Sequence, residues 1–296
     1  MTGVIGIDLG GTAIKLGLFA SDGSCDRSLT VPTPQPATPT AVMDGMVEAI
    51  ATIKSSSTNI EAIGVGLPGP TDAAGRVSKV AINLTDWQNV PLADWLEDKT
   101  GLPAVLANDA NCAALGETWL GAGRGINNSI MLTLGTGVGG AIILDGKLFV
   151  GPRGAAGELG LIVLNPDGPE CNSGNRGSLE QYASVRAIRR ATGKEPRELI
   201  DLAKAGDKNA LEFWQDYGRL LGIGLTSSVY ILTPELIIIG GGISAAAEFF
   251  LPSIEAEIER RVLSSSRINL RILPAKLGNE AGIVGAAKLA FSIINC

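Results

Sequence analysis

Histidine is absent from the 296 residues of this sequence. Without imidazole, no Ser-His-Asp or Cys-His pair and no histidine metal ligand can form, so any general base must be a carboxylate or a lysine. Aromatic residues make up only 4% of the chain, and its four cysteines are far apart with no Cys-x-x-Cys pair. We expect Cys25, Cys112, Cys171 and Cys296 to be free thiols in a reducing compartment.

The sequence also lacks the long apolar run that a membrane span needs and the basic surface that nucleic acids attract. Its most apolar stretch, residues 220–239, is divided by Pro234 and Glu235 into two pieces that are too short to cross a bilayer. Asp8 interrupts the N-terminal apolar run, and no basic region precedes it, so a signal peptide is not expected. A net charge of −6 and a pI near 4.9 disfavour nucleic acid and anionic membranes as partners. These features predict a cytoplasmic protein.

The pattern of expected strands and helices indicates an α/β fold with two similar lobes. Residues 3–9 and 14–19 are expected to form two strands around a glycine turn, and a second strand, glycine turn and strand begin at Ser129. Glycines at residues 121–125 interrupt the pattern. We therefore expect an N-terminal lobe over residues 1–120, a C-terminal lobe over 121–279, and a last helix at 280–296 that packs back on the first lobe.

Three glycine-rich turns, each following an apolar strand, are the most informative feature of the chain. Glycine has no Cβ, so backbone N–H groups in such turns can approach a phosphate closely. One such turn is weak evidence, because β-hairpins use the same glycines. Three of them resemble the walls of a nucleotide cleft. The residues assigned to nucleotide binding are Asp8, Gly10, Gly11, Thr12, Lys15, Gly135, Thr136, Gly137, Gly241 and Gly242.

Asp8 and Lys15 flank the first turn and extend its chemistry. Lys15 could add positive charge beside a transferable phosphate. Asp8 could hold Mg²⁺ through water, since this ion dehydrates reluctantly. The alternative is a hairpin turn with an incidental aspartate.

Asp109 is the candidate catalytic residue. It follows an expected strand at residues 103–106 and begins an expected helix over 110–120, so its carboxylate is held rigidly at a strand-to-helix junction. There it could accept the proton of a hydroxyl group as that oxygen attacks a γ-phosphate. The alternative is a plain helix N-cap formed by Asn108 and Asp109.

Glu158 and Glu180 lie among small residues and are candidates for binding a sugar, because carboxylates accept hydrogen bonds from paired hydroxyls. Asn83 could add an amide group. The alternative for each is a solvated or capping residue. Together with the family resemblance described below, the full set assigned to the sugar is Asn83, Asn108, Asp109, Glu158 and Glu180.

Together these motifs resemble the ROK family of sugar kinases and sugar-responsive repressors, which have the two-lobed actin/Hsp70-like (ribonuclease H-like) ATPase fold. Residues 8–12 and 134–140 are similar to the family's two phosphate motifs, and residues 239–243 to its adenosine motif. Residues 66–70 and 280–286 are similar to its two hinge segments. The resemblance covers essentially the whole chain and implies ATP with Mg²⁺, and a homodimer.

The resemblance also implies roles for single residues. Residues 108–111 with Glu117 match the family's catalytic stretch, in which the aspartate, here Asp109, is the base. Glu158 and Glu180 match its sugar-binding glutamates, and Asn83 matches its sugar-binding asparagine.

One departure from the family concerns zinc. ROK kinases usually carry a histidine and three cysteines that bind a structural zinc ion. At the corresponding positions this chain has Leu161, Cys171, Ser173 and Ser178. One thiol cannot make a tetrahedral site, so no zinc is expected, and the loop that aims Glu158 and Glu180 must be held by hydrogen bonds and packing.

The sequence therefore predicts a glucokinase-like, ATP-dependent hexose kinase. Within the same family, an N-acylmannosamine kinase, a fructokinase or a polyphosphate-dependent enzyme are alternatives. A non-catalytic sugar-sensing regulator is the alternative from another class. Such regulators of the family add an N-terminal helix-turn-helix domain, whereas here the phosphate motif begins within the first residues and the chain is acidic.

Overall fold

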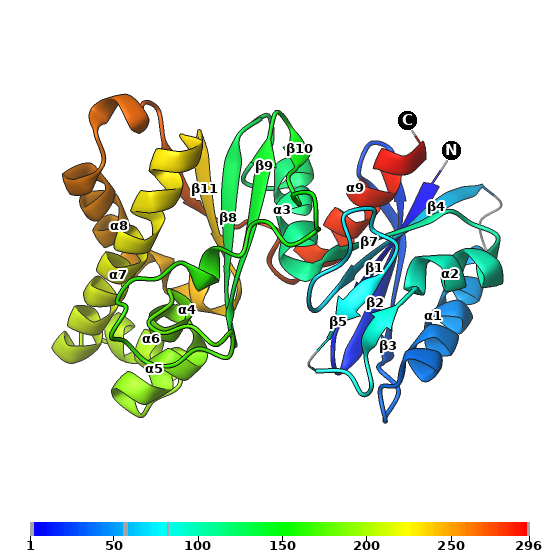
Figure 1. Cartoon of the computed structure of the whole chain (residues 1–296), viewed down its shortest axis with the longest axis horizontal. Coiled ribbons are helices and arrows are strands. Elements are labelled where there is room, and N and C mark those ends of the chain that lie inside the picture. The colour runs from blue at the N-terminus through cyan, green and yellow to red at the C-terminus, as the bar shows by residue number, and fades with distance from the viewer. Residues whose placement is uncertain (1–2, 56–58, 82, 295–296) are drawn as a thin grey trace. The chain divides into compact units, whose positions relative to one another are not determined.

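A computed structural model of the chain describes residues 3–55, 59–81 and 83–294 (Figure 1). The chain divides into two compact units. Unit 1 comprises Met1–Gly125, Leu148–Ala156 and Leu277–Cys296, and unit 2 comprises Ile126–Lys147 and Gly157–Lys276. Cys296 and the last two positions of the helix expected over 280–296 lie outside the described residues.

Unit 1 is built on a five-stranded sheet with the order β3-β2-β1-β4-β7. The first three strands form an antiparallel meander, and β4 and β7 extend it in parallel, as the alternation of strands and helices predicts. Asp8 lies opposite Lys15 on one neighbour and Gly66 on the other. The strands are β1 (Gly3–Leu9), β2 (Ala13–Ala20), β3 (Cys25–Pro32), β4 (Ile60–Leu67) and β7 (Ala104–Asn108).

Helices cover both faces of this sheet (Figure 1). Helices α1 (Pro39–Lys54) and α2 (Leu92–Thr100) pack on one face, and α9 (Ala281–Ile294) packs on the other. α9 also packs against α3 (Asp109–Leu120). A Cβ at Gly64 in β4 would lie 1.9 Å from the Ala286 carbonyl oxygen of α9, so this helix rests directly on the strand backbone. The small residues of α9 thus let this helix pack directly on the backbones of β1 and β4.

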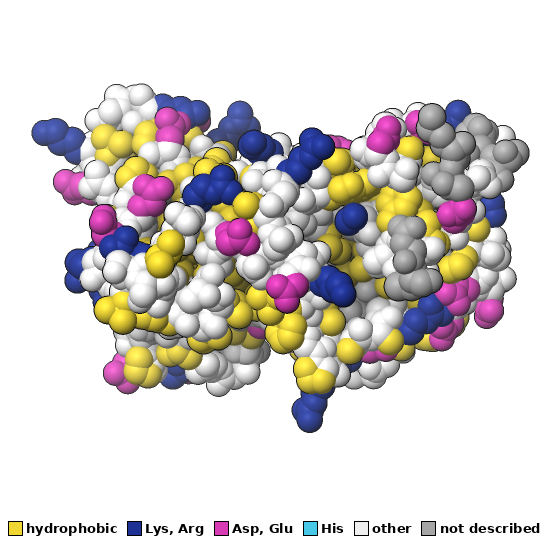
Figure 2. Space-filling model, turned by 90° about the horizontal axis from the view of Figure 1, so that it is seen from above, with side chains coloured by type: hydrophobic (Ala, Val, Ile, Leu, Met, Phe, Trp, Pro, Cys, Tyr) yellow, Lys and Arg dark blue, Asp and Glu magenta, His cyan; other side chains and the backbone are white. Residues whose placement is uncertain are grey.

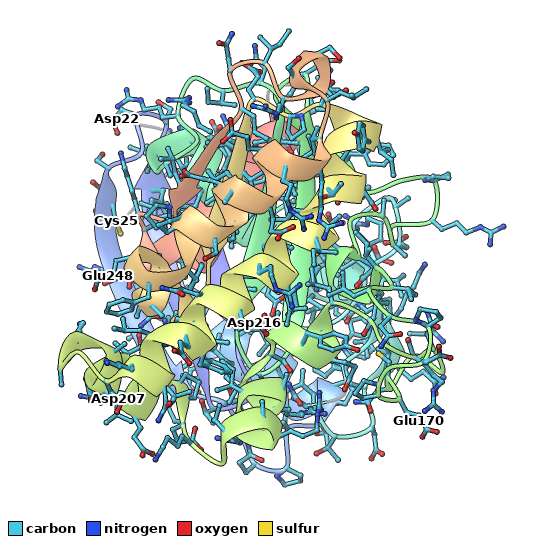
Figure 3. All side chains as sticks on the ribbon, turned by 90° about the vertical axis from the view of Figure 1, so that its left-hand side faces the viewer. Asp22, Cys25, Glu170, Asp207, Asp216 and Glu248 are labelled. Atoms are coloured by element: carbon cyan, nitrogen blue, oxygen red, sulfur yellow. The ribbon has the colours of Figure 1, made fainter. Side chains whose placement is uncertain are left out.

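Unit 2 repeats the plan with a sheet of order β10-β9-β8-β11-β12, in which β8 pairs antiparallel with β9 and parallel with β11. Its core lies against the long helix α7 (Lys208–Leu232), where the buried side chains of Trp214 and Tyr217 meet Phe250 of α8 (Ala247–Arg261). Figure 3 shows α7 and α8 side by side, with Asp216 on α7 and Glu170 on the loop that precedes α4 (Glu180–Ala183). The strands are β8 (Ser129–Leu134), β9 (Val138–Leu144), β10 (Lys147–Leu148), β11 (Leu236–Gly240) and β12 (Arg271–Pro274).

The helices of unit 2 are α4 (Glu180–Ala183), α5 (Val185–Thr192), α6 (Pro196–Lys204), α7 (Lys208–Leu232) and α8 (Ala247–Arg261). Short 3₁₀ turns are η1 (Leu159–Leu161), η2 (Gly242–Ala246), η3 (Ser264–Ser266) and, in unit 1, η4 (Gly278–Glu280). A two-stranded ribbon in unit 1 joins β5 (Ser78–Val80) to β6 (Gln88–Val90). Within the described ranges, none of the helices offers the length and apolar content that a bilayer crossing needs.

Candidate functional site

The Asp8 carboxyl is the centre of the charged groups in unit 1. It is half-buried at the end of β1. Burial raises the pKa of Asp8, the neighbouring carboxyls of Asp109 and Glu280 raise it further, and the Lys15 ammonium lowers it. Two further carboxyls and one ammonium group therefore act on the charge of Asp8.

Lys15 and Asn83 lie beside the same turn. The Lys15 Nζ donates to the Asn279 carbonyl oxygen at 3.2 Å, which ties β2 to the turn that leads into α9. A Cβ at Gly11 would lie 3.8 Å from the Cβ of Asn83, so this asparagine borders the first glycine turn. The structure thus brings together the residues that the sequence assigns to phosphate and one that it assigns to sugar.

Asp109 begins α3 directly after β7. Its predecessor Asn108 caps the helix, because the Asn108 Oδ1 accepts from the Ala110 N–H at 2.8 Å, while the Asn108 Nδ2 donates to the Gly69 carbonyl at 3.3 Å. The Asp109 residue presents substantial surface to solvent, yet protein atoms crowd the carboxyl group itself. This desolvation raises the pKa of Asp109, and hydrogen bonds from the Ala110 N–H and from Asn108 offset part of the rise. The N-cap alternative is therefore correct for Asn108, and the Asp109 residue that follows it is exposed.

The second and third glycine turns belong to unit 2 and lie side by side. The second connects β8 to β9, and the third follows β11. Gly241 in the third turn has φ +83°, and a Cβ there would lie 2.3 Å from the Leu134 carbonyl oxygen at the end of β8. The glycine at this position is thus required by backbone conformation and by close packing.

Glu180 lies against the second turn. Its Oε2 accepts from the Val138 N–H at 3.0 Å, and a Cβ at Gly137 would lie 2.5 Å from the same oxygen. Glu158 is exposed just before η1, where its carbonyl accepts from the Leu161 N–H. Both glutamates are therefore in unit 2, whereas Asn83, Asn108 and Asp109 are in unit 1.

The loop between η1 and α4 is held by hydrogen bonds. The Cys171 N–H donates to the Asn175 carbonyl at 2.8 Å, and the Leu179 N–H donates to the Ile162 carbonyl at 2.8 Å. Burial raises the pKa of the Cys171 thiol, but hydrogen bonding, mainly from Ser173, outweighs it and leaves the pKa below its ordinary value. These donors do not fit zinc, because serine hydroxyls and one thiol are not its structural ligand set.

Three glycines in these turns are not explained by the packing of the protein. A Cβ at Gly135 or Gly242 would meet nothing within 4 Å, and one at Gly11 would meet only ordinary contacts at 3.8 Å. None of the three has the positive φ that favours glycine. Since the protein leaves room for a side chain at each position, the close approach of a ligand is a physical reason for glycine there.

The carboxyl groups near Asp8 suit Mg²⁺ better than a metal that is held by protein alone. Among the described residues, no group of three or more His, Cys, Asp or Glu side chains converges to hold an ion. Mg²⁺ commonly keeps several waters and takes one or two carboxylates together with substrate phosphates. Asp8, with Asp109 nearby, fits that donor set.

Sequence reasoning missed contacts that join distant parts of unit 1. The carboxyl of Glu280 faces Asp8, although it reads in the sequence as the start of a helix. Glu117 is fully buried, and its side chain accepts from the N–H groups of Leu277 and Ala122, both at 2.7 Å. It thereby fastens the end of α3 to the segment that enters η4 and α9. The one signal in the sequence was that Glu117 is an acidic residue close to the glycine-rich segment that ends this helix.

Comparisons with known proteins agree on one family. A family model described as ROK family matches residues 4–293. The glucokinase of Thermotoga maritima is 35% identical over 97% of this chain and 96% of that protein. A solved ROK hexokinase from Thermus thermophilus has a TM-score of 0.89 at 36% identity, covering 99% of both chains. A ROK family glucokinase from Streptomyces griseus, solved in complex with glucose and AMPPNP, has a TM-score of 0.81 at 36% identity, covering 98% of this chain and 99% of that one.

Proposed function

The chain belongs to the ROK family, and we propose that it is a glucokinase-like, ATP-dependent hexose kinase in which Asp109 is the general base. It has the two-lobed actin/Hsp70-like fold of the ROK hexokinase structures. The product of the reaction is a hexose phosphorylated on its primary hydroxyl. Full-length similarity to glucokinases supports the activity, and the position of the Asp109 carboxyl beside Asp8 is the observation that supports the mechanism.

Asp109 acts on the acceptor hydroxyl. Its carboxylate accepts the proton as the sugar oxygen attacks the γ-phosphorus of ATP, and ADP leaves in line. The raised pKa of Asp109 makes it a stronger base than an ordinary aspartate. The rigid junction of β7 and α3 holds it in one place, which lowers the entropic part of the barrier.

Asn83, Asn108, Glu158 and Glu180 bind the sugar ring in this proposal. Carboxylates accept hydrogen bonds from hydroxyl groups, and amides both accept and donate them. The Glu180 carboxylate is already oriented by the Val138 N–H. In this proposal, the primary hydroxyl of the bound sugar is the group that Asp109 deprotonates.

The glycine turns and Lys15 bind the nucleotide. The turns at residues 10–12 and 135–137 offer N–H groups to the phosphates, and the turn at 241–242 borders the adenosine. Asp8 would hold Mg²⁺ through water. Bound with ATP, Mg²⁺ would supply positive charge against the transferred phosphate. A homodimer stays a prediction from the family resemblance.

ATP suits this chain better than polyphosphate as donor. A polyphosphate chain needs a continuous basic track. On the face drawn in Figure 2, the described Lys and Arg side chains are scattered among acidic and apolar ones and form no such track. The chain has 24 Lys and Arg against 30 Asp and Glu.

A coupled ADP-release assay tests the function directly. Purified chain is supplied with ATP, Mg²⁺ and, in turn, glucose, mannose, fructose, glucosamine and N-acetylmannosamine. We expect the highest kcat/KM with glucose. A preference for N-acetylmannosamine or fructose would replace glucokinase by the alternative kinases, and no turnover with any sugar would contradict the kinase proposal and favour a sugar-sensing regulator.

The pH dependence of the reaction should follow the raised pKa of the two carboxyls. A base must be ionised to work, so kcat/KM should fall as the pH drops through the pKa of Asp109. Because burial raises that pKa, the midpoint should lie above the ordinary aspartate value of about 3.9. Asp8 and Asp109 interact, so the midpoint belongs to the pair. Activity that stays constant down to pH 4, with circular dichroism showing intact protein, would contradict this.

Gly135→Ala should impair nucleotide binding without weakening the fold. The protein has room for the added methyl group, so the melting temperature should stay within about 1 °C of wild type. If a phosphate approaches this backbone, the methyl group obstructs it, and the KM for ATP should rise at least about tenfold while the KM for sugar is unchanged. An unchanged KM for ATP would remove the phosphate role from this turn.

A further inference from the structure

The carbonyl groups of the first glycine turn are all held by one neighbouring segment. The buried Thr33 Oγ1 donates to the Gly10 carbonyl oxygen at 2.7 Å, and the Gln35 Nε2 donates to the Gly11 carbonyl at 3.3 Å. The Thr33 N–H donates to the Thr12 carbonyl at 3.0 Å. Three successive carbonyls of the turn therefore point toward the loop that follows β3.

This arrangement decides where the N–H groups of the turn point. In a trans peptide, the C=O of one residue and the N–H of the next lie in one plane and point in opposite directions, and none of these peptides is cis. Fixing the carbonyls of Gly10 and Gly11 thus directs the N–H groups of Gly11 and Thr12 away from the loop. Among the described residues, neither N–H donates to a protein acceptor.

The other two turns have the same construction in unit 2. The Val185 N–H, at the start of α5, donates to the Gly135 carbonyl at 2.8 Å, which directs the Thr136 N–H the opposite way. The Ser244 Oγ and the Ser244 N–H both donate to the Gly241 carbonyl, at 2.7 and 3.0 Å, which directs the Gly242 N–H the opposite way. Within the described part of the chain, these two N–H groups also lack a protein acceptor.

We propose that Thr33, Gln35 and Ser244 are positioning residues that hold the glycine turns by their carbonyls and so aim free N–H groups at the nucleotide. This inference rests on the proposed function, because it takes the ligand of these N–H groups to be ATP. A turn without such bonds can rotate its peptides, and glycine makes that rotation easy. The hydrogen bonds from Thr33, Gln35 and Ser244 therefore give the flexible glycine turns a fixed orientation before the ligand binds, as preorganised donors require.

The test compares a variant that lacks the Thr33 hydroxyl group with one that lacks its methyl group. Binding of AMPPNP with Mg²⁺ to the full chain is measured by calorimetry for wild type, Thr33→Val and Thr33→Ser. Valine keeps the shape and loses the donor, so its affinity should fall about tenfold, whereas serine keeps the donor and should stay within about twofold of wild type. Adenosine, which has no phosphate, should bind all three equally.

Thr226→Val is the matched control. The Thr226 Oγ1 donates to the Gly222 carbonyl at 3.0 Å within α7, so this variant loses the same kind of bond away from the turns. It should leave AMPPNP binding unchanged, and because the Gly222 carbonyl lies inside α7 and keeps its helical N–H donor, its melting temperature should change little. Gln35→Leu, at an exposed position, provides a second variant if Thr33→Val does not fold, and it should weaken AMPPNP binding about threefold.

Several results would overturn the proposal. If Thr33→Val binds AMPPNP as tightly as wild type, the proposal is wrong. If Thr33→Val does not fold, the same result for Gln35→Leu would overturn it. Equal losses in valine and serine would show that packing rather than the hydroxyl matters, and an equal loss of adenosine binding would show general damage. A wild-type chain that binds AMPPNP but phosphorylates no sugar would contradict the hexose kinase proposal alone, and one that binds no AMPPNP would contradict both.

Discussion

Asp109→Asn is expected to lower kcat at least about 100-fold while the protein stays folded and still binds sugar. Asparagine has the size of aspartate but cannot accept a proton, and general bases typically contribute 10²–10⁴-fold. Its amide oxygen can still accept from the Ala110 N–H, so the start of α3 should persist. Initial rates at saturating ATP and sugar measure kcat, and calorimetry measures sugar binding.

The same variant should be no less stable than wild type at neutral pH. The folded-state pKa of Asp109 is raised, so its ionised form is disfavoured by folding, and the stability associated with the protonated form is lost as the pH rises through that pKa. Asparagine removes this effect, and its advantage should shrink as the pH falls toward 4. Asp98→Asn, at an exposed position of α2, removes the same charge and should leave kcat unchanged. A kcat for Asp109→Asn within a few-fold of wild type would show that another group is the base.

Local chemistry explains why much of the fold could be predicted from the sequence. The strands expected at residues 3–9 and 14–19 are β1 and β2, because apolar runs around a glycine turn leave few alternatives. The helix expected over 110–120 is α3, and Asn108 caps it as an Asx residue at a strand end should. The last helix, expected from 280, begins at Ala281. In each case the signal lies within a few residues of the element.

The supports of the site could not be predicted in the same way. Thr33 lies 23 residues from Gly10, and Glu117 lies 160 residues from Leu277, so no local pattern links either pair. Thr33 belongs to a Pro/Thr-rich loop whose composition indicates irregular structure and nothing of what it holds. A hydrogen bond between a side chain and a distant carbonyl depends on tertiary packing, which becomes visible only once the sheet brings β1 and β3 together through β2.

Two helix glycines show how far tertiary packing overrides local preference. Gly45 in α1 and Gly285 in α9 are both inside helices, where alanine is intrinsically better by about 1 kcal/mol. A Cβ at Gly45 would make ordinary contacts with the Pro34 ring at 3.4 Å. A Cβ at Gly285 would lie 1.6 Å from the Cys112 carbonyl oxygen of α3, which is backbone and cannot turn aside. Sequence alone gives the two positions the same preference.

We therefore expect the same substitution to have opposite effects at the two sites. Gly45→Ala should raise the melting temperature by about 2–4 °C. Gly285→Ala must push α9 and α3 apart, which should cost about 3 kcal/mol or more and lower the melting temperature by roughly 6–12 °C. Because α3 carries Asp109 and α9 packs on β1, displacing these helices should also lower kcat, even at temperatures well below the melting temperature. Thermal unfolding and initial rates of both variants measure this, and a Gly285→Ala protein as stable as wild type would show that α3 and α9 are not in backbone contact.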